Sequence, residues 1–360
     1  MKIAVGLSGG IDSTVTLLRL KEEGYRVTAV FLNMLPEGEY QEKTCCSVDS
    51  RLLAKRVASN LGVPFEVWDL TEIFQRNVIN IFKAMINKGL TPNPCVFCNR
   101  SVKIGAFVEM ATRQGFDAIA TGHYARQKDG NLYKALDAWK DQSYMLALVQ
   151  KQVLAKVLFP LGELTHEEVI DYAYSHGIEH VPRSSQDICF MPRGGMEQFI
   201  KQNLSQVIKP GPLVFKSNII GQHKGYPYYT VGQRRGLGIS HGEPLYVKEV
   251  DPTTNTIYVG TSAEIFSESM TVVLMNQFYP LTNQAEIKIR YRSPSVPAYV
   301  KQINGPILHV RFSQPVRAIT PGQIAVAYDG DKVLWAGIIL STQTGDNYKK
   351  VGGTETHHVI

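Results

Sequence analysis

Short apolar runs alternate with longer amphipathic segments over residues 1–122. Runs rich in β-branched residues predict strands at 2–5, 27–32, 64–68 and 117–120. Apolar residues at helical spacing predict helices over 12–23, 49–61, 73–87 and 103–114, with further helical segments over 152–157 and 165–176. Strands that alternate with helices predict a doubly wound α/β domain whose parallel sheet is covered on both faces.

The pattern changes after residue 205, where glycine and proline become frequent and the apolar runs shorten. These runs predict strands at 226–231, 245–250, 256–259, 285–291, 298–302, 307–312, 324–328 and 333–340. Turn sequences such as Asn304-Gly305-Pro306 separate them, which is typical of small antiparallel sheets or barrels. We therefore expect three domains, over 1–200, 201–267 and 268–360.

The composition fits a chain that buries several cores. Its 360 residues exceed one ordinary domain, and hydrophobic residues make up 44% of them against 19% charged. No apolar run reaches the length of a membrane span, and Met1 leads directly into the first predicted strand instead of a secretory leader. We expect a cytoplasmic protein with no membrane association.

Charge and cysteine content narrow the choice of partners only slightly. The net charge of +6 suits an anionic partner such as RNA, although many mildly basic proteins bind no nucleic acid.

An odd number of cysteines in a chain without a leader argues against a disulfide framework. The five are Cys45, Cys46, Cys95, Cys98 and Cys189. We expect thiols that react, bind a metal or have no special role.

A glycine-rich loop joins the first predicted strand to the first predicted helix. It consists of Gly6, Leu7, Ser8, Gly9, Gly10, Ile11, Asp12 and Ser13. Adjacent glycines let backbone N–H groups approach a phosphate, serines add hydroxyl donors, and Asp12 can cap the helix or help to hold Mg²⁺. No lysine follows, so this is not a P-loop. A plain glycine turn with an aspartate cap is the alternative, but the carboxyl end of a strand favours a ligand.

The sequence SGGxDS in this loop resembles the pyrophosphate loop of the ATP pyrophosphatase family. That resemblance implies an enzyme that binds ATP, adenylates an oxygen, releases pyrophosphate and lets a nucleophile displace AMP. The motif identifies the step in which ATP activates an oxygen, but it does not identify the substrate that carries this oxygen.

Two cysteine-bearing segments add candidate nucleophiles. The segment Thr91–Cys98 comes just before the predicted helix over 103–114, so Cys98 is expected near a helix N-terminus, where the dipole favours the thiolate. Cys189 lies in a polar stretch that begins at Ser184. The alternatives are half of a structural zinc site for Cys95 and Cys98, and a buried hydrophobic role for Cys189.

Taken in order, the motifs resemble those of tRNA-specific 2-thiouridylases. They are SGGxDS, TPNPCVFCN at 91–99, ATGHY at 120–124, KDQ at 140–142, DICF at 187–190, GQRRGLG at 232–238, RYR at 290–292 and TPGQ at 320–323. The match covers nearly the whole chain. The resemblance implies an ATP pyrophosphatase catalytic domain, a small central tRNA-contacting domain and a C-terminal antiparallel β-barrel.

The same resemblance implies roles for individual residues. Cys98 would be the nucleophile, Cys189 would carry the persulfide, and Leu32 and Gly122 would flank the adenosine of an ATP held by Gly6–Ser13. The residues implied to meet tRNA are Asn93, Pro94, Cys95, His123, Lys140, Asp141, Gln142, Arg290, Tyr291 and Gln323. The product would be 2-thiouridine at the wobble position, formed after adenylation of the C2 oxygen. The sulfur donor would be a persulfide carrier protein or inorganic sulfide.

Several alternatives stay open from the sequence. Many members of the family have aspartate where this chain has Cys95, so Cys95, Cys98 and Cys189 could instead hold a [4Fe–4S] cluster. An ATP pyrophosphatase acting on a small carboxylate or amide, and a non-catalytic RNA-binding module, are the competing functions. Arg290 and Arg292 are expected on one face of a strand, and the tyrosines over 226–229 are either an RNA surface or ordinary packing.

Overall fold

The structure, a computed structural model, describes residues 1–36, 48–178, 188–192 and 194–342. Cys45, Cys46 and Asp187 lie outside the described residues, as do the C-terminal His357 and His358. The chain forms two compact units, of which the first contains residues 1–79, 94–193 and 330–333. The second contains residues 80–93, 194–329 and 334–360. No helix in the described ranges combines the length and apolar character needed to cross a membrane.

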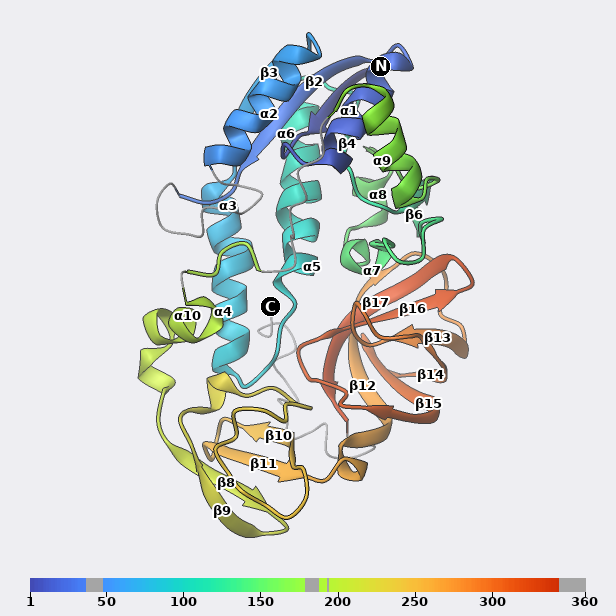
Figure 1. Ribbon diagram of the computed structural model, residues 1–360. Coiled ribbons are helices and arrows are strands. Elements are labelled where there is room, and N and C mark those ends of the chain that lie inside the picture. The colour runs from blue at the N-terminus through green and yellow to red at the C-terminus, as the bar shows by residue number, and fades with distance from the viewer. Residues whose placement is uncertain (37–47, 179–187, 193, 343–360) are drawn as a thin grey trace. The chain divides into compact units, whose positions relative to one another are not determined.

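The first unit is built on a parallel sheet, which confirms the predicted doubly wound α/β fold. Its strands are β1 (Lys2–Gly6), β2 (Arg26–Asn33), β3 (Phe65–Asp69), β4 (Ala118–Ala120) and β7 (Val157–Leu158). They run in the order β3-β2-β1-β4-β7, and all neighbouring pairs are parallel (Figure 1). The predicted helix over 152–157 is wrong at its end, because Val157 pairs with Ile119 as an edge strand.

Helices cover both faces of this sheet because alternate strand residues point to opposite sides. Helices α1 (Ile11–Glu22) and α2 (Val48–Asn60) bury Leu17 and Ala54 against Val5 and Phe31. Trp68 of β3 faces the other way and meets Phe107 of α6 (Phe107–Arg113) edge to face, with ring centroids 5.5 Å apart.

Two long helical runs follow β3. The first comprises α3 (Thr71–Phe74), the π-helical η1 (Gln75–Ile79) and α4 (Asn80–Asn87). The second comprises α5 (Pro94–Cys98), the π-helical η2 (Asn99–Ala106) and α6. The predicted helix over 103–114 therefore begins too late. Proline suits a first helical position, since its missing N–H has no partner there in any helix, and Pro94 starts this run.

The remainder of the first unit consists of short elements. They are β5 (Arg126–Lys128), β6 (Asn131–Tyr133), α7 (Ser143–Leu146), α8 (Lys151–Leu154) and α9 (His166–Ser175). Strands β5 and β6 form a hairpin around Asp129 and Gly130, both with positive φ, and Tyr133 pairs with Lys332. A capping box between Thr165 and Glu168 starts α9.

The second unit holds a four-stranded sheet in the order β10-β11-β8-β9. It follows α10 (Gly195–Asn203) and consists of β8 (Gly211–Phe215), β9 (Asn218–His223), β10 (Tyr246–Asp251) and β11 (Thr256–Gly260). The predicted strand over 226–231 is wrong, because Tyr226–Tyr228 form a 3-10 turn after Gly225. Tyr226 and Tyr229 are buried in the core of this sheet, so ordinary packing is the right interpretation of these two tyrosines.

A closed antiparallel barrel follows, as predicted. Its strands are β12 (Phe266–Gln277), β13 (Gln284–Lys288), β14 (Val296–Asn304), β15 (Ile307–Arg317), β16 (Ile324–Asp329) and β17 (Lys332–Ser341), and β12 pairs with β17 to close it. Trp335 lies fully buried in the barrel core. The strand predicted to reach residue 291 ends at Lys288, because Ser293 and Arg290 hydrogen-bond each other across a turn. The prediction that Arg290 and Arg292 share one face of a strand is therefore wrong.

Candidate functional site

The predicted phosphate loop lies where β1 ends and α1 begins. Gly9 has a φ of +77°, and a Cβ there would lie 3.2 Å from the Ala54 backbone nitrogen, so a side chain would be strained by its backbone conformation and crowded against α2. The Ser13 hydroxyl donates to the Gly10 carbonyl at 2.9 Å and accepts the N–H of Ser8 at 3.2 Å. The loop is thus folded by its own serines, with the N-terminal end of α1 at its base.

Gly122 brings the end of the β4 segment against the first turn of α1. A Cβ on Gly122 would lie 2.9 Å from the Asp12 carbonyl carbon and 3.0 Å from the Ser13 nitrogen. Real Cβ atoms do not approach backbone so closely, so only glycine fits. Leu32 is the last residue but one of the neighbouring strand β2 and is partly exposed. The residues predicted to surround ATP therefore share the carboxyl edge of one sheet, where open α/β sheets bind ligands.

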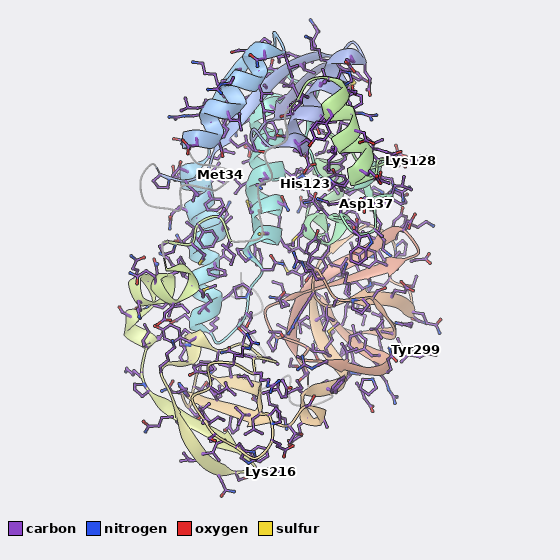
Figure 2. The ribbon with its side chains drawn as sticks, in the orientation of Figure 1. Met34, His123, Lys128, Asp137, Lys216 and Tyr299 are labelled. Atoms are coloured by element: carbon purple, nitrogen blue, oxygen red, sulfur yellow. The ribbon has the colours of Figure 1, made fainter. Side chains whose placement is uncertain are left out.

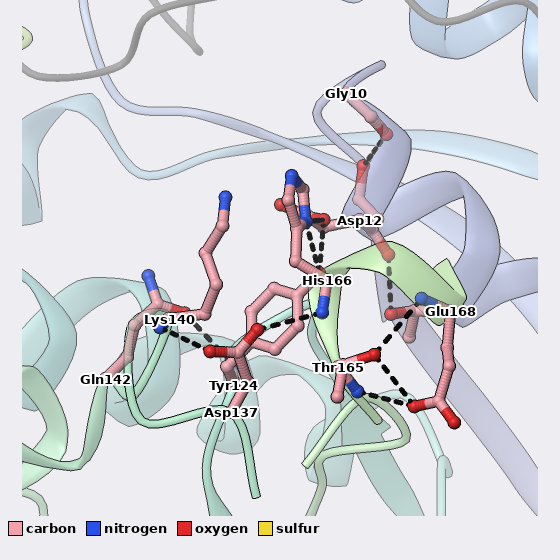
Figure 3. A network of polar contacts seen from close by, with 11 residues as sticks. Gly10, Asp12, Tyr124, Asp137, Lys140, Gln142, Thr165, His166 and Glu168 are labelled. Atoms are coloured by element: carbon pink, nitrogen blue, oxygen red, sulfur yellow. Dashed lines mark hydrogen bonds and ion pairs between the residues drawn. The ribbon is translucent and has the colours of Figure 1, made fainter. Parts of the chain in front are cut away.

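A polar network connects Asp12 to two side chains that follow in the chain (Figure 3). The Tyr124 hydroxyl donates to Asp12 Oδ1 at 2.9 Å and lies 3.0 Å from Nδ1 of His166. Burial and the Asp12 carboxylate raise the pKa of Tyr124, so its hydroxyl keeps its proton. The Asp12 side chain remains 39% exposed, which leaves its carboxylate accessible to a ligand.

The Lys140–Gln142 triplet belongs to a loop whose backbone is held by side chains. Asp141 is buried, and its oxygens accept the Ala135 and Ser143 N–H groups at 3.0 and 3.1 Å. Gln142 accepts the Tyr124 N–H at 2.9 Å and returns its own N–H to the Tyr124 carbonyl at 2.8 Å. Two members of the triplet thus hold the loop beside Tyr124, whereas the ammonium of Lys140 makes no hydrogen bond or ion pair within the described ranges.

His123 immediately follows Gly122 in the chain (Figure 2). The residue keeps some exposed surface, but its titrating imidazole is surrounded by protein atoms. Its Nδ1 shares a hydrogen bond with the Thr121 hydroxyl at 2.8 Å. Burial, and then the nearby ammonium of Lys103, lower the pKa of His123 to about 3. The imidazole is therefore neutral at physiological pH, and any contact it makes with RNA is a hydrogen bond or a packing contact.

The two cysteines of the CxxC segment lie in different environments. Cys95 lies in the first turn of α5 and is exposed, whereas Cys98 is the last residue of α5 and is buried. The prediction that this segment precedes the helix is wrong, because the helix already begins at Pro94 and Cys98 is its fifth residue. Asn99 is buried and donates from Nδ2 to the Met145 carbonyl of α7 at 3.1 Å, which ties the helix of Cys98 to the segment after Gln142.

Arg100 is a functional candidate that sequence reasoning missed. Burial lowers the pKa of its guanidinium, and its side chain makes no ion pair or hydrogen bond within the described part of the chain. A partly buried cation that no described residue neutralises suits an anionic ligand. Its position two residues after Cys98 was the available signal. Tyr124 and His166 were also missed, since no motif brings their side chains to Asp12.

Cys189 is partly exposed and precedes Phe190, which packs edge to face on Phe74 with ring centroids 5.8 Å apart. The described residues contain no group of three His, Cys, Asp or Glu side chains that could hold a metal. Cys95, Cys98 and Cys189 are all described, so they are not arranged as the three ligands of an iron–sulfur cluster.

The predicted tRNA-contacting residues of the second unit make contacts within it. Arg290 donates to the Ala318 carbonyl at 2.6 Å and also to the Thr320 hydroxyl. Gln323 donates to the Thr91 carbonyl at 2.8 Å, two residues before Asn93. The Lys288 ammonium lies over the Tyr291 ring, 5.7 Å from its centroid. Arg290 therefore holds the segment around Ala318 and Thr320, and Gln323 holds the segment around Thr91, all within the second unit.

Comparison with known proteins decides the family. Residues 1–193 match a family model described as "tRNA methyl transferase HUP domain". Residues 197–261 match a model described as "tRNA methyl transferase PRC-barrel domain". Residues 269–339 match a model described as "Aminomethyltransferase beta-barrel domain". The tRNA-specific 2-thiouridylase MnmA of Carboxydothermus hydrogenoformans is 40% identical over 354 residues, covering 94% of this chain and 97% of that protein. This chain belongs to the tRNA-specific 2-thiouridylase family.

A second relative supports the same assignment. The tRNA-specific 2-thiouridylase MnmA 1 of Caldanaerobacter subterraneus subsp. tengcongensis is 41% identical over 355 residues, covering 94% of this chain and 97% of that protein. Among solved structures, "Crystal structure of a 4-thiouridine synthetase - RNA complex with bound ATP" is 19% identical with a TM-score of 0.34, covering 49% of this chain and 41% of that chain. Membership of the 2-thiouridylase family rests on the full-length relatives.

Proposed function

We propose that this protein is an ATP-dependent tRNA uridine 2-sulfurtransferase, which adenylates the C2 oxygen of the wobble uridine and replaces that oxygen with sulfur. The observation that carries the proposal is the 40% identity to a named tRNA-specific 2-thiouridylase over 94% of this chain. The domain descriptions mention methyl transfer, but the thiols of Cys98 and Cys189 suit sulfur transfer, in which a soft nucleophile is required.

The nucleotide would lie on Gly6–Ser13, with Leu32 and Gly122 around the adenosine. The folded loop, the end of α1 and the accessible Asp12 carboxylate support this placement. Asp12 with the Ser8 and Ser13 hydroxyls is an oxygen donor set of the kind Mg²⁺ prefers. When bound, Mg²⁺ would neutralise charge on the phosphates.

The sulfur chemistry balances with two thiols and one external reductant. Uridine O2 attacks the α-phosphorus of ATP, and pyrophosphate leaves. The terminal sulfur of a Cys189 persulfide attacks C2, and AMP departs with the former uridine oxygen. The Cys98 thiolate then attacks Sγ of Cys189, which breaks the S–S bond, leaves sulfur on C2 and forms a Cys98–Cys189 disulfide. An external dithiol, or two single thiols, then supplies the two electrons and two protons that restore both cysteines and is itself oxidised to a disulfide.

We propose the persulfide route over the [4Fe–4S] route because the three cysteines are not grouped as ligands. The donor on this route would be a protein persulfide, whose terminal sulfur passes to the Cys189 thiol while the donor thiol leaves. Inorganic sulfide would be the donor on the cluster route, because sulfide cannot form a persulfide on a thiol without an oxidant. We retain the three domains over 1–200, 201–267 and 268–360 and a cytoplasmic location, where tRNA and ATP are both present, as parts of the same proposal.

The tRNA would contact Asn93–Cys95, His123 and Lys140 in the catalytic part of the chain, and Arg290, Tyr291 and Gln323 further on. The exposed Cys95 and the ammonium of Lys140 support direct contacts. Asp141 and Gln142 would act by holding the loop, because their side chains already bind its backbone and that of Tyr124.

Single cysteine variants test the proposal. Cys98→Ser and Cys189→Ser should each reduce 2-thiouridine formation by a factor on the order of 10³ or more, because a nucleophile or sulfur carrier is lost. Cys189→Ser should still release pyrophosphate when tRNA is added, since adenylation precedes sulfur transfer. Cys95→Ser should retain partial activity. The measurement is thiolated uridine by mass spectrometry, beside iron content and pyrophosphate release.

Cys45→Ser and Cys46→Ser are the matched controls and should retain full activity. Joint loss of iron and activity in Cys95→Ser would establish the cluster route instead. Full activity in Cys189→Ser would contradict both routes, and ATP turnover indifferent to tRNA would support a small-molecule substrate.

A further inference from the structure

Trp139 presents its indole almost entirely to solvent. The residue is 96% exposed, whereas the other two tryptophans, Trp68 and Trp335, are 5% and 0% exposed. Tryptophan is among the largest apolar side chains and is normally buried on folding or on binding a partner. An indole this exposed is accessible to the flat face of a ligand.

The loop that carries Trp139 is held on both sides of it. Asp137 Oδ1 accepts the N–H groups of Trp139 and Lys140 at 2.9 and 3.2 Å, and Oδ2 accepts the His166 N–H at 2.9 Å. Although burial opposes it, these N–H groups lower the pKa of Asp137, so the carboxylate stays ionised. Leu136 donates its N–H to the Gly162 carbonyl at 2.9 Å. The backbone is thus fixed while the indole projects from it.

The ammonium of Lys140 lies beside the indole in the chain, between the carboxylates of Asp137 and Asp141. Lys140 is the next residue, and within the described ranges its ammonium makes no ion pair or hydrogen bond (Figure 3). The neighbouring carboxylates of Asp137 and Asp141 are occupied by backbone N–H groups. A flat aromatic surface next to an available cation matches an unpaired nucleotide, whose base stacks and whose phosphate binds the ammonium.

The loop is also fixed relative to the nucleotide loop. Gln142 pairs with the Tyr124 backbone, Tyr124 donates to Asp12, and Asp137 caps the start of α9 at His166. We propose that Trp139 is a stacking platform for an unpaired base of the bound tRNA, with Lys140 on the adjoining phosphate. This inference rests on the proposed function, because it takes tRNA as the substrate.

Acrylamide quenching of tryptophan fluorescence tests the platform in the full-length protein. Because Trp68 and Trp335 are buried, the quenchable emission comes from Trp139. We expect an unmodified tRNA transcript with a wobble uridine to protect this emission. An RNA duplex without unpaired bases should protect it little, since its bases offer no free face. Trp139→Phe should remove the quenchable component and confirm its source.

The affinity of Trp139 variants for the tRNA transcript shows whether the indole stacks on a base or only lies near the bound RNA. Trp139→Ala should raise the dissociation constant for the transcript about fivefold or more, which is the lower end of base stacking on an aromatic side chain. Trp139→Phe should stay within about twofold of wild type, because a ring still stacks. Leu136→Ala is the matched control, since Leu136 is an exposed apolar residue of the same loop (57%) without a ring, and should bind like wild type.

Thiolation by the wild-type protein is measured in the same samples. If wild type thiolates the transcript but Trp139 stays fully quenchable, or Trp139→Ala binds like wild type, the platform is refuted and the proposed function stands. Equal protection by the duplex also overturns base stacking. If wild type neither binds nor thiolates the transcript, the proposed function itself fails.

Discussion

At the scale of single residues, several motif side chains bind their own chain. Asp141 binds the Ala135 and Ser143 N–H groups, and Gln323 donates to the Thr91 carbonyl. A sequence motif cannot distinguish such a positioning role from direct contact with RNA, because both require the same side chain at the same position. The hydrogen bonds make that distinction for Asp141 and Gln323, and among the motif residues they leave the ammonium of Lys140 available to a substrate within the described ranges.

His123 gives a pH-dependent prediction at this scale. Its pKa is about 3 in the folded protein against 6.5 for an ordinary histidine, so the unfolded chain binds the proton first. Its contribution to stability is therefore complete above pH 6.5 and is lost as pH falls toward 3. One proton changes the free energy of unfolding by at most about 1.4 kcal/mol per pH unit.

Denaturant unfolding of wild type and His123→Asn between pH 7 and pH 4 checks this. The wild-type free energy of unfolding should fall more steeply with acid than that of the variant, so the gap between the two narrows. Parallel curves over this range would show that His123 does not titrate as its surroundings imply.

At the scale of elements, the parallel sheet and the strand–loop–helix of the nucleotide site were predictable from sequence. The β-branched runs and the glycine loop carry strong local signals. Other elements were not predictable, because their cause is tertiary. The β5–β6 hairpin is only three residues a strand and pairs with Lys332, about 200 residues later. The start of α5 at Pro94 was not predictable, because Pro92 and Pro94 favour an extended backbone in the residues before them.

A substitution at Gly122 tests the contact between the segment after β4 and the first turn of α1. Gly122→Ala places a methyl group 2.9 Å from the Asp12 carbonyl carbon, and neither backbone can yield cheaply. We expect ATP affinity to fall by about tenfold or more, corresponding to a strain of about 1–3 kcal/mol. Fluorescent nucleotide titration measures the effect.

Gly242→Ala is the matched control, because a Cβ there meets no atom within 4 Å. It should bind ATP like wild type. Wild-type ATP affinity in a folded Gly122→Ala protein would mean that the nucleotide does not depend on the first turn of α1.

At the scale of the whole molecule, the chain passes between the two units more than once. Residues 80–93 belong to the second unit although their neighbours on both sides belong to the first, and residues 330–333 return to the first. Asp331 there accepts hydrogen bonds from Arg126 at 2.7 Å and from the Lys134 N–H at 2.8 Å. Deleting residues 268–360 would therefore damage the first unit as well, so the overall function is best tested on the full chain.

The central claim is that ATP activates the uridine C2 oxygen, which then leaves with AMP. Full-length protein with ATP, a persulfide donor and a tRNA transcript made from [2-¹⁸O]uridine triphosphate tests it directly by mass spectrometry of the nucleotide products. We predict one ¹⁸O-labelled AMP for each 2-thiouridine formed, because the former C2 oxygen remains bonded to the α-phosphorus. Unlabelled AMP, or ADP in place of AMP, with 2-thiouridine formed would contradict the account.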